Sequence, residues 1–544
     1  MDFFSLAYIL FVLIALIFYY RLPERFQWVV LLIANISFYL ICGKWNIIFI
    51  LITSLSVWLG GRKLSDLSAQ HKVLKKNKEL TKEDKKALKN RFQNKKRLVL
   101  WLVLILNLGI LALIKYFKVF TPVTGLLLPL GISFYTFQAI SYIVDVYGDK
   151  YQAEKNYFRF LLFVSFFPQL IQGPINRYDK LGEQLKRAHK IDGERVKKAL
   201  MLILYGLMKK YAIANMLVDS IEAVISSPVD VVPGALIAFA ILMYSAQQYA
   251  DFSGGIDIVL GVALLFDLEM MPNFRQPYFA TSLGDFWRRW HISLGAFMRD
   301  YVFYPFALLK PMQKFGKWCS KHFGNHFGRV LPAGIANILV FFLVGLWHGA
   351  ESHYIWWGLY NGIVIALSDL LEPAFSKVFP ALHIKSDSKG VHVFRIIRTF
   401  IIVNIGWYFD RIEDFGQCIA SLARTAFHFN LVEFMWSFGN VLLNPNAADS
   451  SYVLGGMALA TISCVIVFVI SVLFENGVDV FGPASSRKAK MHETGGATAA
   501  IAKVEKVGEA VDLRRIFLSL LFIFLIFISF VFMTSTGGFL YANF

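Results

Sequence analysis

The stretch KNRFQNKKRLVLWLVLILNLGILALIKYF, residues 89–117, decides the class of fold to which this sequence belongs. Its second part, residues 98–117, is almost continuously apolar, whereas its first part, residues 89–97, is rich in Lys and Arg. A helix needs about 20 apolar residues to cross a hydrocarbon layer about 30 Å thick. The stretch therefore predicts a transmembrane helix whose basic flank stays on the cytoplasmic side.

Apolar runs of this kind recur along the chain, and hydrophobic residues make up 57% of its 544 residues. That share is far too high for an ordinary water-soluble protein. We expect an all-α, polytopic transmembrane helical bundle of roughly 11 or more spans, with re-entrant helices around a central funnel or tunnel. Besides residues 98–117, the runs are 3–20, 26–41, 47–59, 196–213, 236–249, 330–347, 354–367, 393–408, 452–473 and 516–533.

The formal net charge of +18 is concentrated between the apolar runs, with its densest block at residues 62–97. Basic residues in short loops keep those loops cytoplasmic and lie beside anionic lipid headgroups, so we expect membrane lipid and no nucleic acid as a partner. This charge pattern places the amino terminus outside and residues 62–97 inside, as expected for a multi-pass membrane protein. The first apolar run lacks a basic leader and a cleavage pattern, so we interpret it as a retained span.

Three consecutive regions are expected. Residues 1–120 hold amino-terminal spans and the basic cytoplasmic loop 62–97, and residues 121–370 form a core that we expect to hold the functional site. Residues 371–544 add carboxy-terminal spans, an amphipathic segment at 414–451 and a polar loop at 475–515. Within the core, Pro, Asn, Gln, Arg and His interrupt the apolar segments, and such residues persist at membrane depth where they face protein or a water-filled cavity.

The segment DFWRRWHISLGAFMRDYVFYP, residues 285–305, combines aromatic, cationic and imidazole side chains. Four-residue spacing predicts that Trp287 and His291 share one helix face. The same spacing pairs Asp285 with Arg289. Such a helix can cover a hydroxyl substrate with an aromatic plane and direct cations at a thioester oxygen or a CoA-type phosphate. An interface helix with belt tryptophans and snorkelling arginines explains the same composition, and composition alone favours that interpretation.

A second segment, FFLVGLWHGAESHYIWWGLYNG at residues 341–362, carries His348 at the end of an apolar run, flanked by Gly345 and Gly349. Glycine permits close approach of another chain or a ligand, and a histidine at this depth can exchange protons. If the helix continues, the residues after His348 lie within its reach. A histidine on an apolar helix is more often structural than catalytic. The spacing HGAESH matches no zinc-protease motif, and the four cysteines are scattered, so we expect no metal site.

Seven ordered segments resemble the bacterial polysaccharide branch of the membrane-bound O-acyltransferase family. That branch contains alginate O-acetyltransferase membrane subunits and proteins that transfer D-alanine toward teichoic acids. The segments are PLGISFYTFQAISYIVDVY (129–147), FFPQLIQGPINRY (166–178), YADFSGGIDIVLGVALLF (249–266), PNFRQPY (272–278), DFWRRWHISL (285–294), RDYVFYP (299–305) and GLWHG (345–349).

The resemblance implies that His348 is the general base and that His291 is a second polar residue of the site. We expect Arg288 and Arg289, if they lie close, to keep His291 neutral. Further residues expected to line the passage for the substrate and donor are Asn273, Arg275, Gln276, Asp285, Trp287, Arg288, Arg289 and Trp347.

The resemblance further implies transfer of an acyl group, chiefly acetyl, from a cytoplasmic thioester to hydroxyls of an extracellular or cell-wall polysaccharide. The expected donor is acetyl-CoA, with no bound cofactor, and an extracytoplasmic partner transferase is expected to relay the group. D-Alanyl transfer from a carrier protein toward teichoic acid is the alternative. A transporter and a non-enzymatic scaffold of a polymer export complex also remain open. Solute flux that survives loss of His348 distinguishes the transporter, and a phenotype insensitive to that loss distinguishes the scaffold.

Overall fold

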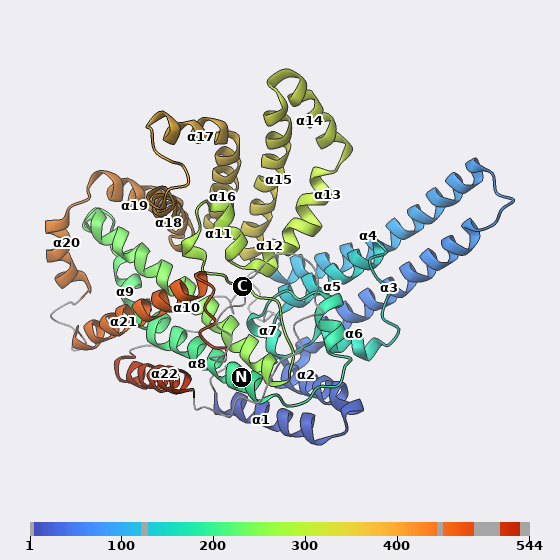
Figure 1. The fold of residues 1–544 in the computed structure, drawn as a ribbon, viewed down its shortest axis with the longest axis horizontal. Helices are drawn as coiled ribbons and strands as arrows, with labels where there is room; N and C mark the ends of the chain where they lie inside the picture. Colours follow the sequence, from blue (N-terminus) through green and yellow to red (C-terminus); the bar gives the residue numbers. More distant parts are fainter. Residues whose placement is uncertain (1–4, 121–128, 443–449, 483–511, 534–544) are drawn as a thin grey trace. The chain divides into compact units, whose positions relative to one another are not determined.

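The structure, a computed structural model, describes residues 5–120, 129–442, 450–482 and 512–533 (Figure 1). Within these ranges every regular element is a helix or a helical turn, and the one β interaction is an isolated antiparallel bridge between Phe274 and Trp290. The all-α prediction is therefore confirmed for the described residues. The chain divides into two compact units, each built from separated stretches. The three consecutive regions expected from composition remain a description of chain order.

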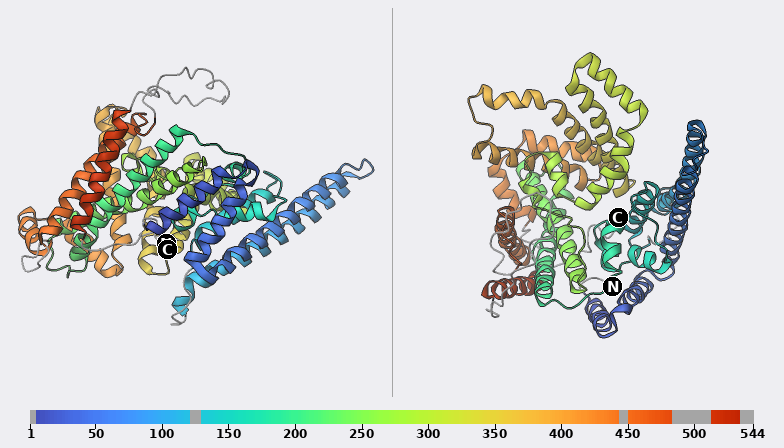
Figure 2. Two further views of the ribbon diagram at one scale, coloured as in Figure 1. Left: turned by 90° about the horizontal axis from the view of Figure 1, so that it is seen from below. Right: turned by 45° about the vertical axis from the view of Figure 1, so that its right-hand side comes forward.

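Unit 1 takes its first helices from Met1–Lys190. The helices are α1 (Leu6–Arg21), α2 (Gln27–Gly43), α3 (Ile47–Lys75), α4 (Lys82–Phe120), α5 (Ile132–Tyr147), α6 (Tyr157–Val164) and α7 (Pro168–Gln172), with short helical turns at Glu24–Phe26, Lys44–Asn46 and Tyr178–Gly182. Helices α3 and α4 form a long hairpin whose basic end projects from the rest of the unit (Figures 1 and 2). Its apolar end packs against α5, because only that half of the hairpin carries an apolar surface to bury.

The second part of unit 1 comes from Phe266–Phe427. Its helices are α11 (Leu283–Arg289), α12 (Ile292–Met298), α13 (Tyr304–Ala307), α14 (Lys310–Phe323), α15 (Asn325–His348), α16 (Ser352–Leu370), α17 (Glu372–Ala381), α18 (Lys389–Arg411) and α19 (Phe415–Phe427), with short turns at Pro277–Phe279 and Arg299–Phe303. Helices α15 and α16 pack along each other as a hairpin. The chain bends by 64° between α16 and Glu372–Val378, which makes this pair either a broken span or a re-entrant loop.

Unit 2 consists of the described parts of Ile191–Leu265 and His428–Phe539. Its elements are α8 (Gly193–Lys209), α9 (Asn215–Ile225), α10 (Gly234–Leu265), α20 (Leu431–Ser437), α21 (Ser450–Glu475) and α22 (Leu513–Phe532), with turns at Lys210–Ala214 and Phe438–Leu442. Two ion pairs join the end of α8 to α10. The Lys209 ammonium lies 2.5 Å from Asp257, and that of Lys210 lies 2.5 Å from Asp251. Pairing offsets the desolvation of these lysines, whose side chains are almost completely buried.

Seven helical stretches in the described ranges are long and apolar enough to cross a membrane, and the bent pair makes eight. They are Glu24–Lys75, Lys82–Tyr116, Gly193–Ile225, Asn325–His348, Lys389–Arg411, Tyr452–Glu475 and Leu513–Phe532. Helix α1 is apolar but shorter. The expected count of roughly 11 spans is thus not reached by this measure, and the central funnel stays a prediction. Large apolar side chains are exposed along these stretches, as a lipid-facing surface requires.

Two predicted segments of the carboxy-terminal region lie partly outside the described residues. The described part of the amphipathic segment 414–451 forms α19, α20, the turn Phe438–Leu442 and the first two residues of α21. Exposed apolar side chains on these helices include Phe427, Met435 and Trp436, in keeping with the predicted amphipathic character. The polar loop 475–515 is described at its two ends, and residues 483–511 fall outside the described ranges.

Candidate functional site

A cavity of about 530 Å³ lies within unit 1, between the α11–α12 segment and the α15–α16 hairpin. Both predicted histidines, His291 and His348, line it, although they are far apart in the sequence. Trp287 and Arg288 also contribute to the wall. The structure therefore brings four of the predicted residues to one place.

The chain leaves helical conformation at Trp290, so the prediction that Trp287 and His291 share one helix face is wrong. Helix α11 ends at Arg289, and His291 takes φ +48°, a left-handed conformation, before α12 begins. The cause is the antiparallel bridge between Phe274 and Trp290, in which the Arg275 amide donates to the Arg289 carbonyl at 3.0 Å. Such strain in a residue other than glycine persists only where the surroundings enforce it, and it is found most often at functional sites.

Asn273 holds the bend in place. Its side-chain oxygen accepts hydrogen bonds from the Ser293 amide at 3.0 Å and the Ser293 hydroxyl at 2.8 Å. The same oxygen lies 3.2 Å from Nδ1 of His291. Since the oxygen can only accept, Nδ1 carries the proton and Nε2 is left as the basic nitrogen of the ring. Asn273 is therefore a positioning residue behind the cavity wall, where the sequence predicted a lining residue.

Burial lowers the pKa of His291 to about 3, so the ring is neutral at physiological pH. The direction of this shift agrees with the predicted neutral ring, but its cause differs from the one predicted. Desolvation accounts for the shift. The side chain of Arg288 is 70% exposed, and that of Arg289 is engaged by Asp285, whose Oδ2 lies 3.1 Å from its Nε. The predicted pairing of Asp285 with Arg289 is thus correct.

His348 is the last residue of α15 and is buried among aromatic rings. Its ring centre lies 4.8 Å from that of Trp347, 5.0 Å from that of Trp357 and 5.7 Å from that of Tyr354. The helix does not continue, because Gly349 is extended and α16 starts afresh at Ser352. The condition under which Glu351 and Ser352 would lie within helical reach of His348 is therefore not met.

The end of α15 is capped from another helix. The ammonium of Lys115, on α4, donates to the Trp347 carbonyl, and the hydroxyl of Tyr116 donates to the Leu346 carbonyl. The last carbonyls of a helix have no partner within it, and a cation is favourable at this end of the helix dipole. These contacts fix the turn of α15 that presents His348 to the cavity.

Trp287 forms part of the cavity wall and is oriented by α16. Its indole N–H donates to the Asn361 side-chain oxygen at 3.0 Å, and its ring packs at 85° against Trp357, with 5.4 Å between ring centres. The Asn361 amide in turn donates to the Trp357 carbonyl at 2.9 Å. Asn361, which the sequence did not single out, thus locks two aromatic residues of the wall in one arrangement.

Not every predicted residue reaches the cavity. Arg275 is exposed and contributes its backbone to the bridge, whereas Gln276 adopts φ +38° at a turn. Trp347 supports both histidine rings from behind, with 6.1 Å between its ring centre and that of His291. Residues missed by the sequence lie on α15 and α16. Counting back from His348 at helical spacing gives Val344, Phe341 and Asn337, all of which line the cavity, so the period of α15 was the available signal.

A separate cavity of about 550 Å³ lies beside residues 151–159 and 178–186 of unit 1. Its carboxylate Glu154 accepts from the Tyr178 hydroxyl at 2.6 Å and pairs with Lys186 at 2.9 Å. These partners satisfy the group as part of the structure, so the two-histidine cavity is the better candidate for chemistry. Within the described ranges, no cluster of three or more His, Cys, Asp or Glu is arranged to hold a metal ion.

Replacing Asn273 with alanine is expected to lower the melting temperature of the purified protein, because the buried Ser293 amide and the His291 ring lose their acceptor. Leaving such groups unsatisfied costs about 1–3 kcal/mol. Thermal unfolding in detergent measures the effect. Asn94→Ala is the control, since it makes the same substitution at an exposed position of α4 and is expected to leave the melting temperature nearly unchanged. An unchanged melting temperature for Asn273→Ala would contradict this account of the bend.

These features define a class of protein: a multi-pass helical membrane protein in which two buried histidines line one cavity with an aromatic wall. Comparison with known proteins supplies the family. The sequence model of the membrane-bound O-acyltransferase family matches residues 37–317, and the chain belongs to that family. His291 lies inside the matched segment, and His348 lies beyond it.

Three relatives illustrate the similarity. The chain is 36% identical to a protein named "Probable alginate O-acetylase AlgI" of Pseudomonas syringae pv. tomato, over 54% of this chain and 50% of the relative. It is 29% identical to the protein of the same name in Pseudomonas aeruginosa, over 77% of this chain and 72% of the relative. It is 26% identical to the "Teichoic acid D-alanyltransferase" of Bacillus subtilis, over 53% of this chain and 69% of the relative. The match to the first relative thus spans only half of that protein's length.

Proposed function

We propose that the protein is a membrane O-acyltransferase that moves an acetyl group from a thioester donor to hydroxyl groups of an extracellular or cell-wall polysaccharide. The observation that carries the proposal is the meeting of two buried histidines, His291 and His348, at one cavity. Family membership supports the reaction type, and the two relatives named as alginate O-acetylases support acetyl as the acyl group.

The proposed reaction needs one proton transfer and no redox step. The acceptor hydroxyl oxygen forms a bond to the thioester carbonyl carbon, and the carbon–sulfur bond breaks. His348 accepts the hydroxyl proton and returns it to the departing thiolate. A neutral imidazole suits this task near neutral pH. His291 presents an unprotonated Nε2 toward the same space and orients the reacting groups through a hydrogen bond.

Charge at the cavity supports a donor that carries phosphate. Arg288 and Arg299 both line the cavity and have exposed side chains, and Asp369 of α16 lines it too. Each guanidinium also lies near a carboxylate of its own segment, Arg288 at 3.6 Å from Asp285 and Arg299 at 2.9 Å from Asp300, and keeps further N–H donors for a ligand. Guanidinium groups bind phosphate oxygens in a bidentate manner, so they fit the phosphates of acetyl-CoA. In this proposal the donor enters from the cytoplasmic side of the bacterial inner membrane. An extracytoplasmic partner transferase completes delivery to the polymer.

The alternative acyl group is D-alanine, delivered by a carrier-protein thioester toward teichoic acid. The similarity to the Bacillus subtilis relative favours it specifically. The cavity chemistry is compatible with both acyl groups, because the same base and the same carbonyl chemistry serve each. The identity of the ester on the polymer therefore distinguishes the two candidates.

Deletion of the gene is expected to remove ester-linked acetate from one envelope or exported polysaccharide, and the wild-type gene on a plasmid is expected to restore it. The physical reason is that the ester can form only where the cavity joins donor and hydroxyl. Mild alkaline release followed by chromatography of the purified polymers measures acetate and D-alanine in the same sample. Loss of D-alanine with acetate unchanged would select the alternative. Unchanged polymer esters of both kinds would refute the proposal.

A further inference from the structure

Among its ionisable side chains, helix α14 carries basic residues and no acidic ones. It carries Lys310, Lys314, Lys317 and Lys321 and no acidic residue. These four positions follow the spacing i, i+4, i+7 and i+11, which places them on one narrow stripe of the helix surface. Helix α14 lies within a longer stretch of sequence, residues 301–350, that contains no Asp or Glu. We call these four residues the lysine stripe.

The lysine stripe faces away from the protein. All four side chains are exposed, and among the described residues no carboxylate forms an ion pair with any of them. The opposite face of α14 is covered by α15, and Cys319 on that face is completely buried. The positive charge of the stripe is therefore not neutralised by the described part of the chain.

Close packing fixes the direction in which the stripe points. A Cβ atom added to Gly316 would lie 2.9 Å from the carbonyl oxygen of Gly328 on α15, and one added to Gly328 would lie 2.5 Å from the Cβ of Ser320. Backbones that approach so closely leave little freedom for α14 to rotate about its axis. The stripe is thus held outward by the α14–α15 contact.

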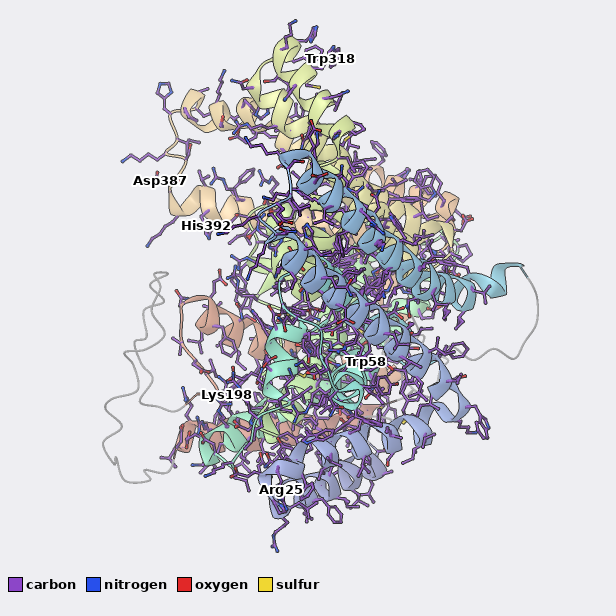
Figure 3. All side chains as sticks on the ribbon, turned by 90° about the vertical axis from the view of Figure 1, so that its right-hand side faces the viewer. Arg25, Trp58, Lys198, Trp318, Asp387 and His392 are labelled. Atoms are coloured by element: carbon purple, nitrogen blue, oxygen red, sulfur yellow. The ribbon has the colours of Figure 1, made fainter. Side chains whose placement is uncertain are left out.

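Aromatic rings border the stripe. Trp318 is 51% exposed, and Figure 3 shows it at the outer end of the α14–α15 pair. Its ring centre lies 4.7 Å from that of His322 and 5.7 Å from that of Phe323. Tryptophan beside a row of lysines is the composition of helices that lie at a membrane surface, where the ring enters the headgroup region and the ammonium groups meet phosphate.

We propose that α14 is a binding surface for anionic phospholipid headgroups, with the lysine stripe contacting phosphate and Trp318 inserted beside it. Three observations select this occupant: unneutralised charge of one sign, a flanking exposed tryptophan, and direct continuity with α15, a candidate membrane span. Each lysine at an anionic surface contributes roughly fivefold in affinity. The proposal is independent of the acyl-transfer function.

The test uses the full chain in nanodiscs, with its four native cysteines replaced and a nitroxide attached at Gln313→Cys, an exposed position beside the stripe. Collision with a water-soluble nickel chelate is measured by electron paramagnetic resonance. The chelate's access to the label is expected to fall severalfold when phosphatidylglycerol is added to phosphatidylcholine. Changing the four lysines of the stripe to glutamine is expected to abolish that response.

The matched control changes four exposed lysines of α4, Lys82, Lys86, Lys89 and Lys95, to glutamine, which alters the net charge equally. This control variant is expected to keep the full response. Melting temperatures in phosphatidylcholine alone check that all variants are folded. They are expected to stay near the wild-type value, because the substituted side chains are exposed. A label that stays equally accessible in both lipids overturns the proposal. Loss of the lipid response in both variants also overturns the proposal, because overall charge would then explain the effect. Lysine-dependent binding of an acidic protein, with no response to phosphatidylglycerol, overturns it as well and assigns the stripe to a protein partner.

Discussion

His348→Ala is expected to abolish acyl transfer while the protein remains folded and inserted in the membrane. The substitution removes the proposed proton acceptor from the cavity. Loss of a general base typically lowers the rate about 10²–10⁴-fold. Transfer by membranes that contain equal amounts of wild-type and variant protein measures the effect, and monodisperse elution in detergent reports folding.

His353→Ala is the matched control. The two histidines are equally buried, at 5% exposure, but His353 lies on α16 and does not line the cavity. The control is expected to retain most of the transfer activity. His291→Ala is expected to impair transfer less than His348→Ala, because water or a neighbouring polar group can partly replace an orienting hydrogen bond. Near-normal transfer by a folded His348→Ala protein would remove the central residue of the mechanism and favour the scaffold interpretation.

Gly358→Ala is expected to destabilise the protein and to abolish transfer as well. The added Cβ would lie 2.3 Å from the Phe341 carbonyl oxygen at the crossing of α15 and α16. Gly345 faces the same crossing, where an added Cβ would lie 2.3 Å from the Tyr354 carbonyl oxygen. Backbone atoms cannot move aside as a flexible side chain can, so the two helices must separate. Overpacking costs about 1–3 kcal/mol, occasionally more, which exceeds the roughly 1 kcal/mol that alanine gains over glycine in a helix.

Thermal unfolding in detergent, followed by the transfer assay on the same preparation, measures both effects of Gly358→Ala. Gly109→Ala is the control, because Gly109 lies within α4 and a Cβ added there meets no other atom within 4 Å. The control is expected to be neutral or slightly stabilising. A Gly358→Ala protein as stable and active as the control would show that α15 and α16 can separate without cost. That result would contradict the close backbone contact at their crossing.

The class of fold was accessible from the sequence because its signal is local. A run such as residues 98–117 is apolar over its whole length, and no tertiary contact is needed to recognise it. The predicted pairing of Asp285 with Arg289 succeeded for the same reason, since both residues lie within one short helix. His291 and His348 were recognised through their motifs, and the structure places both at one cavity.

The errors share a physical cause. The sequence predicted an unbroken helix through Trp287 and His291. The helix is broken because Trp290 pairs with Phe274, a residue outside the helix, and helical spacing alone does not reveal that pairing. The neutral state of His291 was attributed to neighbouring arginines, whereas burial by the rest of unit 1 accounts for it. Arg275 and Gln276 carried the same motif signal as Asn273, yet only the Asn273 side chain turns toward the histidine.

By itself, the sequence determined that this chain is a helical membrane protein, where its apolar runs lie, and which motifs carry the candidate chemistry, because hydropathy and motif spacing are written along the chain. The tertiary structure alone decided that His291 is turned out of its helix by a bridge to Phe274 and held by Asn273. It also decided that the glycine-lined crossing of α15 and α16 brings His348 and Trp357 to the same cavity. Such arrangements depend on contacts between separate elements of the chain, and their energies appear only when those elements meet.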